Sequence, residues 1–137
     1  HIVIEITENS SLSDEELAKL RGLVYGHAPI ALDDYGTGHS NIVNLLRYSP
    51  QIIKVDRYLI TNIQNDTNKQ MFFHSTVEFA RLNGIKVLAE GVETSEELRC
   101  TAKLGADLIQ GYYTGRPAPD PLDEIDSKIR KELMELQ

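Results

Sequence analysis

The chain has 137 residues, of which 41% are hydrophobic and 26% charged, a composition typical of one globular domain rather than a disordered or fibrous segment. Its net charge of -7 disfavours binding to long nucleic acid, because such binding depends on Lys and Arg contacts with phosphates. No apolar run reaches the roughly 20 residues needed to cross a bilayer, and the single cysteine, Cys100, excludes an intrachain disulfide and suits a packing role.

Short β-rich runs alternate with helix-like stretches along the chain, which is typical of a parallel sheet or barrel. Five runs are predicted as strands: residues 2–6, 30–32, 52–55, 86–89 and 107–109. After the first strand, Ser13 and Glu16 have the spacing of a capping box, which predicts a helix. A shorter helix over residues 41–48 is expected to end ahead of Pro50, because the residue before proline is disfavoured in the helical region.

Three further helices are expected in the second half of the chain. A helix over residues 68–83 should end at Gly84, and a second capping box at residues 94–97 should open a helix that ends at Gly105. Glycine favours such ends because it adopts the left-handed conformation at little cost. An amphipathic final helix, about residues 121–136, is expected to pack on the outside of the same domain. We see no linker or repeat, so one domain is the simplest interpretation.

Ionisable and polar residues gather where the predicted strands end. They are Glu5, Glu8, Asp33, Asp34, Lys54, Asp56, Glu90, Glu93 and Gln110. Any one of them alone is better explained as a loop carboxylate with an ordinary salt-bridge partner or as a helix cap. In a (βα) barrel, however, every strand delivers its C-terminal end to the same rim, so the joint pattern predicts a shared site. Glu5 stands inside an apolar strand, where an unpaired carboxylate is costly, so a lysine or a metal ion is expected beside it.

The carboxylates at these strand ends offer only hard oxygen ligands, which favours Mg²⁺ or Mn²⁺ over structural zinc. The adjacent pair Asp33 and Asp34 could serve two ions, an arrangement known for phosphodiester hydrolysis. Lys54 and Asp56 lie on the same face of their strand and could instead simply neutralise each other. The glycine-rich residues 36–38 lack the spacing of a P-loop.

Five motifs, in the same order along the chain, resemble the signature motifs of EAL domains. They are Glu5-Ile6-Thr7-Glu8, Asp33-Asp34-Tyr35-Gly36-Thr37-Gly38, Ile53-Lys54-Val55-Asp56, Ala89-Glu90-Gly91-Val92-Glu93-Thr94 and Gln110-Gly111-Tyr112-Tyr113 with Arg116-Pro117. The resemblance covers nearly the whole chain and implies an α/β fold, a (βα) TIM-type barrel.

Such a barrel usually takes about 250 residues, and no Glu-Ala-Leu segment is present. We therefore expect residues 1–137 to be the C-terminal part of a single EAL domain, an incomplete barrel with about the last five strands. His39 and Asn41 depart from the family, whose loop more often has Tyr and Ser there.

The resemblance implies a phosphodiesterase that hydrolyses cyclic di-GMP to linear pGpG with two Mg²⁺ or Mn²⁺ ions. By position, it assigns metal binding to Glu5, Asp33 and Asp34, catalysis to Lys54, Glu90 and Asp34, site lining to Gln110, and support of the loops to Glu8 and Glu93. The remaining ligands of the family belong to the N-terminal part of the barrel, so the fragment alone is expected to be inactive or impaired.

The resemblance also implies a bacterial, cytoplasmic setting, with sensor or GGDEF-type domains and a membrane tether allowed in the parent protein. An open barrel would favour a homodimer or another association through its sheet edges. Two alternatives stay open at this point. One is a catalytically silent EAL-like module that binds cyclic di-GMP or a protein partner as a sensor. The other is an unrelated metal-dependent barrel, such as an aldolase or an enolase-like enzyme, with no affinity for a cyclic dinucleotide.

Overall fold

The computed structural model describes residues 2–7, 10–24, 28–37, 42–119 and 124–136. Five parallel strands form one sheet in sequence order, and every strand expected from the sequence is present with ends that differ by a few residues at most. The strands are β1 (Ile4–Thr7), β2 (Ile30–Tyr35), β3 (Ile52–Val55), β4 (Lys86–Glu90) and β5 (Leu108–Gln110). In the described ranges the sheet does not close, so β1 and β5 are its edges, as expected for an incomplete barrel.

Helices connect the strands, as a parallel sheet requires. They are α1 (Asp14–Val24), α2 (Ile42–Tyr48), α3 (Arg57–Ile60), α4 (Thr67–Leu82), α5 (Ser95–Lys103) and α6 (Ser127–Glu135), with a 3-10 turn at Ile63–Asn65. Both predicted capping boxes are confirmed: the Glu16 amide donates to Ser13 Oγ at 3.3 Å, and the Thr94 box opens α5. Gly84 and Gly105 follow α4 and α5 with φ of +68° and +100°, as the predicted helix ends require.

Two features differ from the sequence expectation. The final helix begins at Ser127 rather than near residue 121, because Asp126 caps it by accepting the Lys128 amide at 2.8 Å. Residues 120–123 lie outside the described ranges. The short helix α3 was not predicted, since its four residues are too few to show a helical period.

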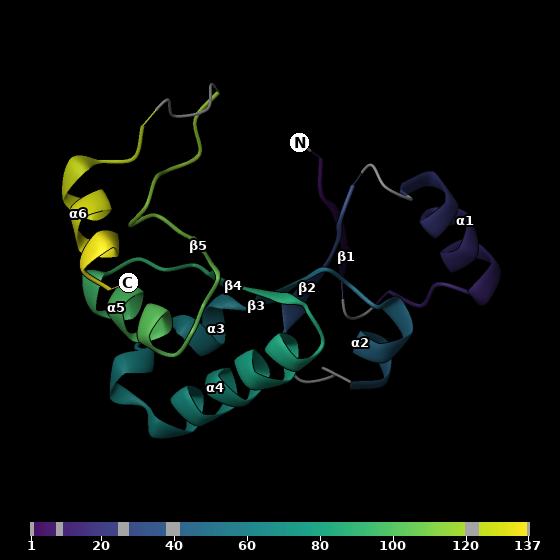
Figure 1. Ribbon diagram of the computed structural model, residues 1–137, viewed down its shortest axis with the longest axis horizontal. Coiled ribbons are helices and arrows are strands. Elements are labelled where there is room, and N and C mark those ends of the chain that lie inside the picture. The colour runs from purple at the N-terminus through teal and green to yellow at the C-terminus, as the bar shows by residue number, and fades with distance from the viewer. Residues whose placement is uncertain (1, 8–9, 25–27, 38–41, 120–123, 137) are drawn as a thin grey trace.

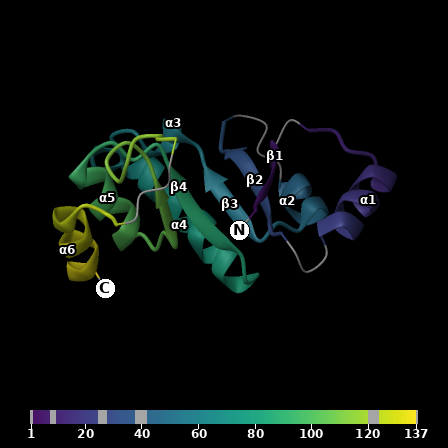
Figure 2. The same cartoon turned by 90° about the horizontal axis from the view of Figure 1, so that it is seen from above.

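The central strands form the core. Ile53, Val55, Val87 and Ala89 of β3 and β4 are fully buried, and α4 packs against this side of the sheet through Phe73. Figures 1 and 2 both show α1 and α6 at opposite ends of the long axis, with the sheet between them. None of the described helices is long and apolar enough to span a membrane.

Candidate active site

A buried lysine lies at the centre of the rim formed by the strand ends. Lys54, on β3, is only 5% exposed. Its Nζ lies 2.9 Å from Glu5 Oε1 on β1, 2.8 Å from Asp33 Oδ1 on β2 and 3.6 Å from Glu90 Oε2 on β4. The structure thus brings together four of the predicted site residues, one from each of four neighbouring strands.

The charges of this cluster shift the pKa values within it. Burial lowers the pKa of Lys54, but the carboxylates of Asp33, Glu5 and Glu90 raise it, and the net result lies well above the ordinary value. The pKa of Glu90 is raised, first by burial and then by the charges of Asp33 and Glu5, while Lys54 opposes the shift. Lys54 is therefore a permanent cation, and ionisation of Glu90 is less favourable than that of an ordinary glutamate.

The two aspartates sit on an irregular stretch of β2. Leu32 pairs with Ile53 and Tyr35 pairs with Val55, so β2 carries one residue more than β3 between these pairs. Asp34 adopts a left-handed backbone with φ of +58°, a conformation that few residues other than Gly, Asn and Asp accept. In a regular strand, consecutive side chains point to opposite faces of the sheet. The irregularity breaks this alternation at the end of β2, as it must if Asp33 and Asp34 both serve one site.

The donor set suits a hard divalent cation. Asp33 Oδ1 is buried, and Lys54 Nζ lies 2.8 Å from it as its partner. A buried carboxylate oxygen that already faces one cation, next to further carboxylates, suits a divalent cation as well. Among the described side chains, however, no three from His, Cys, Asp and Glu are grouped closely enough to hold a metal. The metal roles of Glu5, Asp33 and Asp34 fit the oxygen chemistry and stay predictions.

Three other predicted residues lie near or beyond this cluster. Gln110 ends β5, is paired in register with Glu90, and is exposed. Glu93 forms an ion pair with Arg57 at 3.3 Å, and both side chains are largely in solvent, where such pairs contribute little. Glu8 lies outside the described residues. The site-lining and loop-supporting roles of these residues remain predictions.

Two expectations about partners are settled by the contacts. Mutual neutralisation of Lys54 and Asp56 is wrong, because Asp56 caps α3 by accepting the Tyr58 amide at 2.7 Å. The expected partner of Glu5 is confirmed as Lys54. The side chain of Glu5 is nevertheless 51% exposed, so its desolvation is smaller than its place in an apolar strand suggests.

The sequence did not reveal the full role of Glu97. This buried carboxylate accepts the amide of Thr94, as its capping box implies, and also the amides of Glu93 and, at 2.9 Å, of Asn62. It therefore joins the loop after β4 to the turn after α3. Asn62 is distant in sequence and unrelated to any motif, so only the capping spacing pointed to Glu97.

The open parallel sheet with an acidic rim at its strand ends is that of a TIM-like (βα) barrel. The sequence model of the EAL domain matches residues 1–117, and the chain belongs to this family. It is 34% identical over 131 residues to the probable cyclic di-GMP phosphodiesterase PdeN of Escherichia coli K12, covering 95% of this chain and 25% of that protein.

A second relative is the bifunctional diguanylate cyclase/cyclic di-GMP phosphodiesterase MucR of Pseudomonas aeruginosa, with 32% identity over 121 residues, 87% of this chain and 18% of MucR. The fold is similar to a structure of BlrP1 of Klebsiella pneumoniae, a manganese and cyclic di-GMP complex at pH 9.0. That similarity has a TM-score of 0.78 and 36% identity, and it covers 85% of this chain and 30% of BlrP1. The chain spans a quarter or less of the length of these two curated relatives.

Proposed function

We propose that this chain, within a complete EAL domain, takes part in the metal-dependent hydrolysis of cyclic di-GMP to linear pGpG. The observation that carries the proposal is the cluster of Lys54 with Glu5, Asp33 and Glu90 at the rim. The named activity of relatives such as PdeN, and the ligands in the BlrP1 structure, supply the substrate.

Each residue of the cluster has a role that follows from its position and charge. Glu5, Asp33 and Asp34 would hold Mg²⁺ or Mn²⁺, two ions in the complete site, together with ligands from outside this chain. Bound ions neutralise the scissile phosphate and lower the pKa of the attacking water.

Lys54, fixed between carboxylates, is preorganised to orient that water or to stabilise negative charge as it develops. Glu90, whose carboxylate lies 3.6 Å from Lys54 Nζ, would belong to the same network and accept a proton from that water. Gln110, beside Glu90, lines the rim.

The wider setting of the chain is also part of the proposal. The open edge at β5, where Leu108 is 36% exposed, supports association with the remaining barrel strands or with a second copy. The chain alone is expected to be inactive or impaired. A GGDEF-type partner domain is supported by MucR, which is named as both a diguanylate cyclase and a phosphodiesterase. A cytoplasmic site of action is proposed because the substrate would be a bacterial signal inside the cell.

A catalytically silent module that binds cyclic di-GMP is the second candidate. It stays open because the ligands that belong to the N-terminal part of the barrel lie outside this chain, and their loss would silence the site. Such a module would keep the fold and the rim without turnover.

The test is hydrolysis of cyclic di-GMP by the complete domain with Mg²⁺ or Mn²⁺. Glu5→Ala is compared with Glu15→Ala, which removes a carboxylate from the exposed face of α1. Loss of activity in Glu5→Ala alone supports the phosphodiesterase. Binding without turnover in the unmodified domain selects the silent module that binds cyclic di-GMP, and the absence of both binding and turnover rules out both of these candidates.

A further inference from the structure

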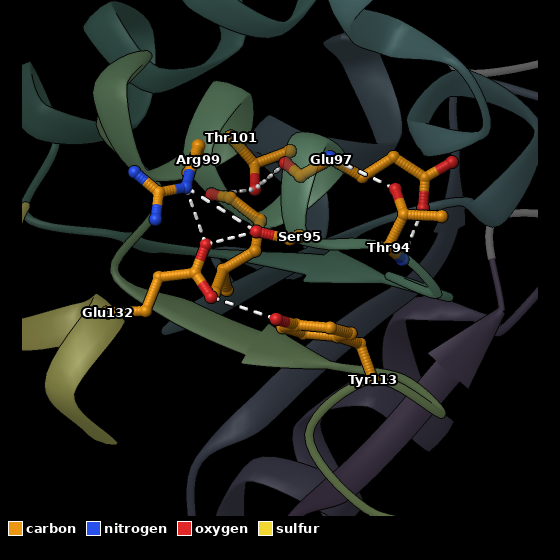
Figure 3. A network of polar contacts seen from close by, with 8 residues as sticks. Thr94, Ser95, Glu97, Arg99, Thr101, Tyr113 and Glu132 are labelled. Atoms are coloured by element: carbon orange, nitrogen blue, oxygen red, sulfur yellow. Dashed lines mark hydrogen bonds and ion pairs between the residues drawn. The ribbon is translucent and has the colours of Figure 1, made fainter. Parts of the chain in front are cut away.

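The C-terminal helix carries a buried carboxylate that lies outside the rim cluster. Glu132, on α6, is 5% exposed. It accepts hydrogen bonds from Arg99 Nε at 2.6 Å, from Tyr113 OH at 2.8 Å and from Ser95 Oγ (Figure 3). The hydrogen bond from Ser95 is the main cause that lowers the pKa of Glu132, those from Tyr113 and Arg99 add to it, and burial opposes them. Glu132 is therefore ionised at neutral pH.

The two carboxylate oxygens of Glu132 serve different parts of the fold. Oε1 accepts from Ser95 and Arg99, which both belong to α5. Oε2 accepts from Tyr113, which follows β5. An ion pair with Arg99 alone would satisfy the charge of Glu132 and attach α6 to α5. The hydrogen bond from Tyr113 to Oε2 is an additional contact, and it connects α6 to the segment after β5.

The segment that contains Tyr113 is packed directly on the loop after β4. The Tyr113 amide donates to Val92 O at 3.0 Å, and the Val92 amide donates to Gln110 O at 3.1 Å. At Gly111 a Cβ atom would lie 2.1 Å from Val92 O, so only glycine allows this approach. The backbone of Gln110, at the rim, is thus held by the loop after β4 and the segment after β5. Residues that follow these two strands, Ser95 and Tyr113, donate hydrogen bonds to Glu132.

We propose that Glu132 is a positioning residue, which through Tyr113 and Ser95 holds the segments after β4 and β5 in the arrangement that places Gln110 and Glu90 at the rim. Helix α6 lies beyond residues 1–117, which the family model matches, so this control comes from a part of the chain outside that match. The expected effect of Glu132 on turnover of cyclic di-GMP rests on the proposed function.

The experiment uses two variants in the complete domain. Tyr113→Phe removes only the hydroxyl, and Glu132→Gln keeps the shape of the side chain but removes its charge. Glu135→Gln is the control, because it makes the same change at an exposed position on the same helix. Steady-state kinetics with cyclic di-GMP and hydrogen–deuterium exchange of the Val92 and Tyr113 amides are measured for each.

Both variants should lower kcat/KM by about tenfold, the order of effect of losing one hydrogen bond to a charged group, because they displace both Gln110 and the catalytic Glu90. The two amides should exchange faster, and the control should change neither quantity. Faster exchange with an unchanged kcat/KM would overturn the proposal, since Glu132 would then only attach α6. Unchanged exchange would also overturn it.

The exchange measurement separates this proposal from the proposed function. If the unmodified domain does not hydrolyse cyclic di-GMP, the phosphodiesterase assignment fails, and unchanged exchange of the Val92 and Tyr113 amides in the variants would still overturn the role of Glu132 in holding the two segments.

Discussion

Replacing Lys54 by Met removes the ammonium that pairs with the three rim carboxylates, and it keeps most of the apolar stem. Breaking a buried ion pair costs about 3–5 kcal/mol, because it leaves buried charge without compensation. Here the carboxylate side chains are 51%, 18% and 28% exposed, so water compensates part of the loss. We expect the free energy of unfolding to fall by about 2–3 kcal/mol at neutral pH in the absence of divalent ions.

Urea denaturation with a chelator measures this difference, and Lys86→Met is the matched control. Lys86 is an exposed lysine on the neighbouring strand β4, so its loss should change stability by no more than about 0.5 kcal/mol. Because the folded pKa of Lys54 lies above its ordinary value of 10.5, its contribution is complete below pH 10.5 and is lost only at higher pH. Mn²⁺ should restore part of the stability of Lys54→Met. An equal cost for the two substitutions would refute the central role of Lys54.

Three further predictions concern other parts of the fold. Gly111→Ala should destabilise the protein by at least about 2 kcal/mol in urea denaturation, because its Cβ would meet the Val92 backbone, whereas Gly22→Ala, with open space in α1, should stabilise it by about 0.5–1 kcal/mol. The stability difference between Glu132→Gln and the unmodified chain should be present above pH 4.5 and vanish as the pH falls through the lowered pKa of Glu132, as followed by thermal unfolding. Cys100, whose pKa is raised by burial, should react with a thiol reagent at pH 8 much more slowly in the native protein than in urea.

Sequence patterns predicted those features of the fold and site that depend on local chemistry or on strand order. The capping boxes and glycine helix ends need only a few neighbouring residues, so they were predictable. Convergence of Glu5, Asp33, Lys54 and Glu90 followed from the rule that parallel strands deliver their C-terminal ends to one rim. Which carboxylates Lys54 would contact depends on strand register and on the irregularity in β2, and no local pattern contains that information.

The partners of Glu132 were also beyond sequence reasoning, for a different reason. They depend on how α6 docks against α5 and against the segment after β5, which are brought together only by the complete fold. The start of α6 was misplaced because an apolar period continues ahead of Asp126, while the cap itself decides where the helix begins.

The charge balance of the rim links the composition of the chain to its proposed chemistry. One ammonium faces three carboxylates there, so the fully ionised cluster carries excess negative charge. Burial is the first cause that raises the pKa of Glu90, and the charges of Asp33 and Glu5 add to it. A phosphodiester approaching this rim would be repelled. A divalent cation would remove that repulsion and would lower the pKa of Glu90 at the same time. The same acidity that disfavours binding of long nucleic acid therefore makes the binding of an anionic dinucleotide depend on bound cations. When those cations are absent, Lys54 holds the carboxylates together.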